Sequence, residues 1–67
     1  MIEFKLHILM AEKKLNQKEL SELTGIGKNS INRYYNNTCD KITKKHLDIL
    51  CKFFDCELND LIEYKKD

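Results

Sequence analysis

The sequence contains no proline, no tryptophan and only two glycines. A composition so poor in chain breakers suits short helices joined by tight connections. No apolar run approaches the roughly 20 residues that a helix needs to span a bilayer, and charges interrupt the N-terminal stretch. We therefore expect neither a membrane span nor a signal peptide, and we expect the chain in the cytoplasm.

The chain also lacks the patterns that mark common enzymes. It has no G-x-S-x-G motif, no phosphate-binding loop and no paired acid and base residues at a characteristic spacing. The sequence therefore predicts no enzymatic activity, no cofactor and no small-molecule ligand.

Three cysteines, Cys39, Cys51 and Cys56, are an odd number, and none forms a C-x-x-C pair. Without a secretory signal they indicate a reduced protein rather than a disulfide scaffold. Cys51 falls on the inward face of its expected helix, where cysteine acts as a small inert hydrophobe. Cys56 follows five residues later, off that helical face, which argues against a metal site with His46. His7 has no second ligand three or four residues away and is expected on the surface.

The net charge is only +1, and its distribution is more informative. Residues 1–27 carry four lysines and four glutamates, so their charges cancel. Residues 46–67 carry three lysines against six acidic residues, giving −3. Residues 28–45 carry five cations against Asp40, giving +4. The positive excess lies where a nucleic-acid contact would need it, although ordinary solvated charges give the same count. The five cations are Lys28, Arg33, Lys41, Lys44 and Lys45.

The stretch Asn16–Tyr35 carries the clearest structural signals. Asn16 is a typical helix cap, and Glu19 three residues later completes a capping box. Leu15 before the cap and Leu20 in the first turns form a hydrophobic staple. These signals predict a helix that begins directly after Asn16.

A glycine turn separates this helix from a second one. Gly25 can take the left-handed conformation that ends a helix, and after Ile26 a short helix fits residues 28–35. Its inward positions are Ile31 and Tyr34, at i, i+3 spacing. Helix, glycine turn and a helix with a polar, basic outer face describe a helix-turn-helix. The outward positions all carry hydrogen-bonding side chains: Lys28, Asn29, Asn32, Arg33 and Asn36.

This stretch resembles the DNA-reading motif of small phage-repressor-like bacterial regulators of the Cro/repressor, xenobiotic-response-element type. The match includes Gln17 opening the first helix, Ser21 at a small position where helices cross, and Gly25 in the turn. Tyr35 stands where many members have glutamate, and Gly27 where many have serine or threonine, which leaves the base preference open. The apolar positions of the match are Leu20, Ile26, Ile31 and Tyr34.

The resemblance extends over residues 4–64 and implies an all-helical, five-helix lambda-repressor-like domain. We expect residues 1–67 to form one domain with its motif at residues 16–35. Periodicity places the remaining helices at about residues 5–14, 44–54 and 57–62, with a loop at 36–41. Thr43 is the expected cap of the fourth helix, and Phe53 lies off its inner stripe and is a candidate for exposure. The inward residues of the last two helices are Leu47, Leu50, Cys51, Phe54, Leu58, Leu61 and Ile62.

Both ends of the chain alternate apolar and charged residues. Ile2–Phe4 and Ile62–Lys65 could pair as a small antiparallel ribbon, or both could be frayed ends. The sequence leaves these two interpretations open.

The resemblance also assigns residues to DNA. Lys28 and Asn29 occupy the positions that touch bases most often in this family, and Asn32 and Arg33 could touch bases or phosphates. Gln17, at a helix N-terminus, can hold a phosphate, and in the family it braces the first reading residue. Further candidates for phosphate contacts are Asn36, Asn37, Lys41 and Lys44.

The expected function is therefore binding of double-stranded DNA by a transcriptional regulator, most simply a dimeric repressor. One reading helix contacts only a few base pairs, so two copies about 34 Å apart are expected on one face of the duplex. A protein-interaction module, such as an antitoxin-like or adaptor domain, is the competing interpretation. The joining surface must avoid the basic middle of the chain, which leaves Ile2, Phe4, Phe53, Leu61 and Tyr64.

Overall fold

Helices make up most of the fold, as the sequence predicts. The computed structural model describes residues 1–66, which form five helices and one two-stranded sheet. This confirms the five-helix architecture and shows that the chain ends pair rather than fray. In chain order the elements are β1 (Ile2–Phe4), α1 (Leu6–Glu12), α2 (Gln17–Thr24), α3 (Lys28–Asn36), α4 (Lys44–Phe54), α5 (Leu58–Leu61) and β2 (Ile62–Tyr64).

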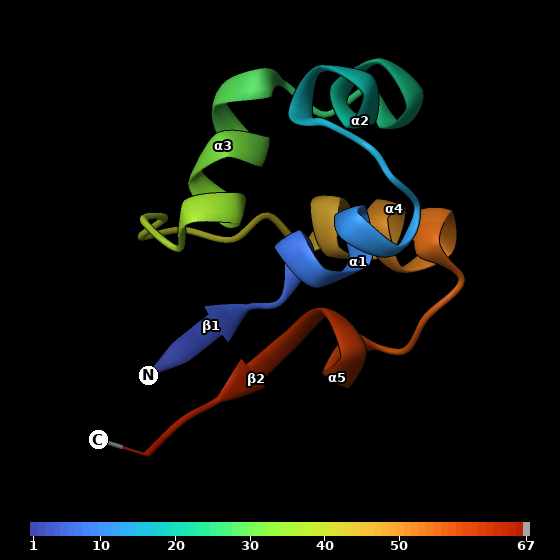
Figure 1. Cartoon of the computed structure of the whole chain (residues 1–67). Helices are drawn as coiled ribbons and strands as arrows, with labels where there is room; N and C mark the ends of the chain where they lie inside the picture. The colour runs from blue at the N-terminus through green and yellow to red at the C-terminus, as the bar shows by residue number, and fades with distance from the viewer. Residues whose placement is uncertain (67) are drawn as a thin grey trace.

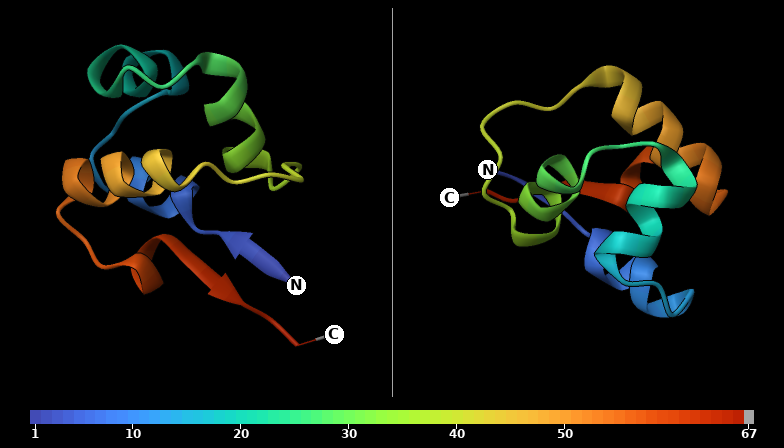
Figure 2. Two further views of the ribbon diagram at one scale, coloured as in Figure 1. Left: turned by 180° about the vertical axis from the view of Figure 1, so that it is seen from behind. Right: turned by 90° about the horizontal axis from the view of Figure 1, so that it is seen from above.

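The elements lie in three tiers (Figure 1). α2 and the start of α3 form the top, α1 and α4 lie beneath them, and α5 with the β1–β2 ribbon lies at the bottom. The view from behind in Figure 2 shows the same order. α3 descends along one side of the domain from the top tier toward the ribbon.

The core draws on every helix and on β1. Six side chains are essentially inaccessible, and no polar or charged side chain of the described residues is buried. Each large apolar side chain that is fully covered contributes about 1.5–3 kcal/mol to folding. Ile31 and Tyr34 anchor α3 in this core, so its opposite face points outward. The inaccessible residues are Leu6, Leu20, Ile26, Ile31, Leu50 and Leu61.

The ribbon pairs β1 with β2 in antiparallel register, with Ile2 opposite Tyr64 and Glu3 opposite Glu63. The two facing carboxylates would repel each other, and Lys65 lies between them. Its Nζ is 3.0 Å from Oε2 of Glu3 and 3.8 Å from Oε1 of Glu63. The hydrogen bond to Glu3 and the two negative charges raise the pKa of Lys65. Lys65 thus relieves a like-charge pair at the end of the ribbon.

Three helices end in the same way, with a left-handed residue that is not glycine. Lys14, Asn37 and Asp55 have φ of 55°, 58° and 51° after α1, α3 and α4. In each case the next N–H bonds back to a carbonyl five residues earlier, at 3.0 Å. This is the Schellman motif, which satisfies the last carbonyls of a helix. The donor and acceptor residues are Leu15 with Met10, Thr38 with Arg33, and Cys56 with Cys51.

Several boundaries and exposures differ from the sequence expectations. α1 ends at Glu12 rather than at residue 14, because the chain turns left-handed at Lys14. α5 covers only Leu58–Leu61, and Leu58 is 48% exposed rather than inward. Phe53 is half-buried because its ring packs edge-on against Phe54, with centroids 5.0 Å apart.

Candidate nucleic-acid interface

The start of α2 is fixed by the predicted capping box. The backbone N–H of Glu19 donates to Oδ1 of Asn16 at 2.7 Å, and the N–H of Asn16 donates to Oε1 of Glu19 at 3.1 Å. These bonds satisfy two N–H groups at the end of the helix. They set Gln17 in the first turn of α2, with its side chain half-buried beside α3.

The connection between α2 and α3 is held by four short-range hydrogen bonds. Gly25 has φ of 79°, and its N–H donates to the carbonyl of Ser21 at 2.9 Å. The hydroxyl of Ser21 donates to the carbonyl of Ile26 at 2.6 Å. Thr24 donates to Leu20 at 2.7 Å and accepts from the N–H of Ile26 at 3.3 Å. The sequence predicted the role of Gly25, but not that the hydroxyls of Ser21 and Thr24 would hydrogen-bond within the connection between α2 and α3.

Tyr34 determines how α3 sits on the body of the domain. Its side chain is 3% exposed, and its ring stacks on Phe4 with centroids 4.6 Å apart. Its hydroxyl lies 2.8 Å from Nδ1 of His46 on α4. α3 is thus attached to a strand on one side and to a helix on the other. His46 has this positioning role, which the sequence reasoning did not find.

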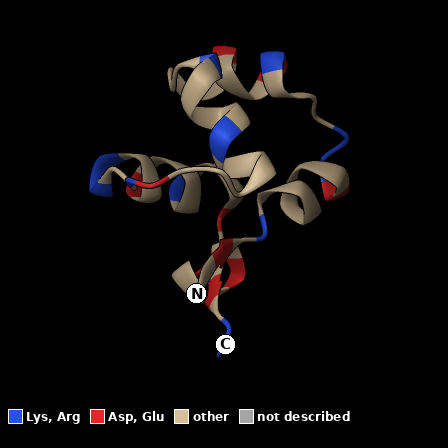
Figure 3. Ribbon diagram, turned by 90° about the vertical axis from the view of Figure 1, so that its left-hand side faces the viewer, with Lys and Arg blue, Asp and Glu red and all other residues tan. Residues whose placement is uncertain are grey.

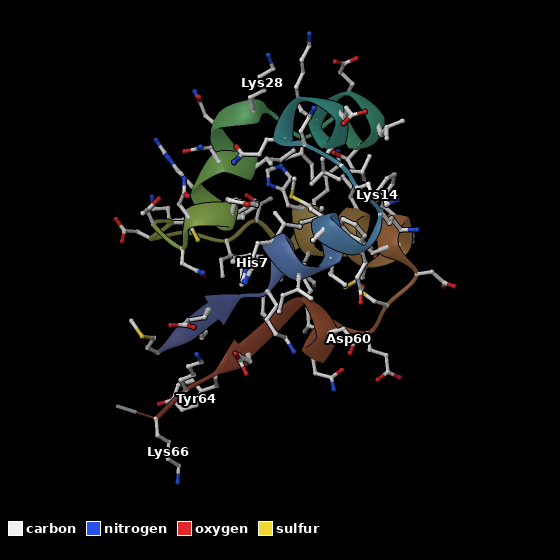
Figure 4. The ribbon with its side chains drawn as sticks, in the orientation of Figure 1. His7, Lys14, Lys28, Asp60, Tyr64 and Lys66 are labelled. Carbon is white, nitrogen blue, oxygen red and sulfur yellow. The ribbon has the colours of Figure 1, made fainter. Side chains whose placement is uncertain are left out.

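The outer face of α3 is polar along its whole length, as predicted. All five outward residues are exposed, and Lys28 points away from the body at the top of the helix (Figure 4). Asn32 lies in the middle of this face, and its Nδ2 donates to Oε1 of Gln17 at 3.2 Å. The structure therefore joins two predicted site residues, with Gln17 bracing Asn32 rather than the first residue of α3. The five outward residues are Lys28, Asn29, Asn32, Arg33 and Asn36.

Asn37 has a structural role that the sequence did not predict. Its Oδ1 accepts from the N–H of Phe4 at 2.6 Å, and its Nδ2 donates to the carbonyl of Phe4 at 3.3 Å. The side-chain amide therefore pairs with the backbone edge of β1, and its second N–H is the group left for the predicted phosphate contact. The structural role was missed because the partner is 33 residues away in the sequence.

Two further predicted phosphate contacts follow α3 in the chain. Lys41 is exposed in the loop after α3, and Lys44 is the first residue of α4. Arg33 and Lys41 line a shallow hollow together with residues of this loop. Figure 3 shows Lys and Arg on the helices and the loop with acidic residues among them, and acidic groups next to a cation on the ribbon.

The predicted dimer residues do not form one surface. Phe4 and Leu61 are 2% and 0% exposed within a single chain, so neither offers area to a second copy. Ile2 and Tyr64 are 57% and 71% exposed, on the same face of the ribbon. Sequence periodicity correctly found apolar residues at the chain ends, but it does not separate a strand's buried position from its exposed one.

These features define the class of protein. A capped helix, a left-handed glycine turn and a second helix anchored by its apolar side form a helix-turn-helix domain with an exposed polar face. The chain matches the model of the Cro/C1-type HTH DNA-binding domain over residues 5–67, and it belongs to that family. This family is a DNA-binding class rather than an enzyme class.

A curated relative supports the assignment. The chain is 30% identical over 60 residues to the uncharacterized HTH-type transcriptional regulator YozG of Bacillus subtilis (strain 168). The alignment covers 90% of this chain and 71% of that protein. Within residues 1–66, no helix is long and apolar enough to cross a membrane.

Proposed function

We propose that this chain is a cytoplasmic transcriptional regulator that binds double-stranded DNA at specific sequences as a homodimer. The observation that carries the proposal is the outer face of α3, which presents five exposed polar side chains and is positioned by the contacts of Tyr34 and Gln17. An α-helix with such a face fits the major groove, where each base pair presents a distinct pattern of donors and acceptors.

The first turn of α3 supplies the base contacts. Asn29 suits a bidentate pair with adenine, and Lys28 suits the acceptor edge of guanine. One N–H of the Asn32 amide is used by Gln17, so this amide meets the groove in a fixed orientation with its other groups free. Arg33 follows on the same face and reaches either a base edge or the backbone.

Phosphate contacts flank α3 and position it. The N-terminus of α2 at Gln17 presents backbone N–H groups to one strand. Asn36, Lys41 and Lys44 are exposed around the other end of α3 and suit contacts with the sugar–phosphate backbone. Such contacts set affinity and register but not sequence preference.

The second copy binds through the exposed apolar surface at the bottom of the domain. We call it the ribbon patch: Ile2, Leu58, Ile62 and Tyr64, which line one shallow hollow. Lys5 and Glu63 also line this hollow, so a two-fold contact can set a cation of one copy beside an anion of the other. In Figure 4 Tyr64 lies at the opposite end from Lys28, so pairing leaves both α3 helices accessible.

Occupancy of the binding site is the proposed means of regulation. A dimer bound across a promoter blocks polymerase and represses transcription, whereas a dimer bound beside a promoter can recruit polymerase. The competing function is a protein-interaction module that uses the same fold to bind a protein partner. The two differ in ligand, because a module of that kind has no preferred duplex and no affinity that falls with salt in the manner of phosphate contacts.

Selection of bound duplexes from a random library tests the proposal. The chain should enrich a two-fold symmetric site, and Lys28→Ala or Asn29→Ala should each lose about 1–3 kcal/mol of affinity for it. Lys52→Ala is the matched control, because Lys52 is exposed and lies near the far end of α4, where its Nζ is 3.4 Å from Oδ2 of Asp48. Full affinity and selectivity in both α3 variants would overturn the assignment.

A further inference from the structure

The C-terminal end of α4 brings two cysteines together. The chain turns left-handed at Asp55, whose N–H donates to the carbonyl of Lys52 at 3.3 Å. The N–H of Cys56 then donates to the carbonyl of Cys51 at 3.0 Å. In this Schellman motif the residues five apart meet through their side chains, and here both are cysteines. A spacing of five residues therefore separates two side chains within a helix but not at its end.

The backbone bond limits how far apart the two residues lie. A donor–acceptor distance of 3.0 Å, together with the covalent lengths on each side, bounds the Cα–Cα separation of Cys51 and Cys56 at about 7 Å. Disulfides join α-carbons roughly 4.4–6.8 Å apart. In a straight helix the axial rise over five residues alone is about 7.5 Å. The left-handed turn at Asp55 therefore brings the two α-carbons closer together than a continuous helix would.

The side chains of this pair interact and are reachable. Both cysteines are free and half-buried, and both pack against the hydrophobic core. Burial raises the pKa of Cys56 most, and the electrostatic interaction with Cys51 comes next. Nearby Asp60 and a hydrogen bond with Cys51 act in the same direction. Cys56 also lines a shallow hollow between α1 and α5, so small reagents have access to it. No third ligand accompanies the pair in a metal-binding arrangement within residues 1–66.

We propose that Cys51 and Cys56 form a reversible dithiol–disulfide pair that low-molecular-weight disulfides oxidise. One cysteine thiolate attacks the external disulfide, giving a mixed disulfide and one released thiol. The second cysteine attacks the protein sulfur of that intermediate and displaces the other external thiol. Two protein S–H bonds are replaced by one S–S bond, and the reagent accepts the two electrons and two protons. A reversible bond of this kind fits a reducing compartment, where disulfides are mostly transient.

The bond would act on the joint between α4 and α5. α5 runs directly into β2, and Leu58, Ile62 and Tyr64 of that segment belong to the ribbon patch. Oxidation therefore fixes the segment that carries the proposed dimer surface. α2 and α3 contain no cysteine, and Cys39 lies in the loop after α3.

Alkylation and mass spectrometry test the pair directly. The intact chain is equilibrated with defined ratios of oxidised and reduced glutathione, quenched in acid and treated with iodoacetamide. The expected product carries no glutathione and is alkylated at Cys39 alone. Its mass is two hydrogen atoms below that of the reduced chain alkylated at the same single position. Cys39→Ser should give the same internal bond, whereas Cys51→Ser should give only a glutathione adduct.

A second experiment shows whether the fold promotes the disulfide between Cys51 and Cys56. The same equilibration in concentrated urea should require a glutathione ratio at least about tenfold more oxidising to reach half oxidation. Two outcomes would overturn the proposal. One is glutathione on separate cysteines of the folded wild type without an internal bond, and the other is equal oxidation of the folded and unfolded chains.

Discussion

Asn37 joins the end of the proposed reading helix to the outer edge of β1, and its replacement tests how firmly α3 is held. The side-chain amide accepts from the N–H of Phe4 at 2.6 Å and donates to its carbonyl at 3.3 Å. Phe4 also stacks on Tyr34, so one strand residue contacts α3 in two ways. Asn37→Ala removes both hydrogen bonds and leaves the partly buried N–H of Phe4 without this partner.

The expected loss of folding stability in Asn37→Ala has two separable parts. A donor left unpaired in a partly buried place costs about 1–3 kcal/mol. Asn37 also has φ of 58°, a conformation that asparagine tolerates but that costs alanine about 1 kcal/mol more. Glycine avoids the second cost, so Asn37→Gly should lose only the hydrogen-bond part. A chain of this length has a total stability of about 3–10 kcal/mol, so either loss is large.

Urea and thermal unfolding followed by circular dichroism measure these losses. The melting temperature should fall by about 4–8 °C for each kcal/mol lost, with Asn37→Ala less stable than Asn37→Gly. Asn36→Ala is the matched control, because Asn36 is an exposed neighbour at the end of the same helix. If Asn37→Ala were as stable as Asn36→Ala, or if the glycine variant matched the wild type, the attachment of α3 to β1 would be refuted.

Three further predictions follow from the same structure. Gly25→Ala should lower the free energy of unfolding in urea by about 1 kcal/mol, because φ is 79°, although no atom lies within 4 Å of the new Cβ. Gly27→Ser, at φ of −60°, should instead raise it by a few tenths of a kcal/mol, because serine is a better helix cap. The opposite order of stability would contradict the turn geometry. Tyr64→Asp should give monomers by sedimentation at micromolar concentration, whereas Leu23→Asp, on α2 and 61% exposed, should not; a dimer that survives the first change would exclude the ribbon patch. Lys44→Ala should weaken binding to all duplexes alike and reduce the salt slope by roughly one, and a base-specific loss would reassign Lys44 to reading.

The sequence predicted best the features that depend on near neighbours. The capping box of Asn16 and Glu19 and the left-handed Gly25 appear where short-range chemistry requires them. The bounds of α4, Lys44–Phe54, also match, because its apolar stripe is uninterrupted and a turn follows directly. Thr43 precedes that helix as expected, although its side chain makes no capping hydrogen bond.

The features that were missed depend on contacts between distant segments or on unusual backbone conformations. The partner of Asn37 lies on a strand at the other end of the chain, so no local pattern signals that its amide is already used. Phe4 and Leu61 are buried because the ribbon folds under α1, which alternation alone does not reveal. Left-handed helix ends at Lys14 and Asp55 lack the glycine that would mark them. For that reason the spacing of Cys51 and Cys56 alone predicts two different faces of a continuous helix.

The most direct test of the central proposal is the affinity of the wild-type chain for its selected duplex compared with a scrambled duplex of equal length. Both are titrated at several salt concentrations by fluorescence anisotropy. The proposal predicts a preference of at least about a thousandfold at physiological salt, with both affinities falling as salt rises. Equal affinity for the two duplexes, or affinity for neither, would contradict a sequence-specific DNA-binding function.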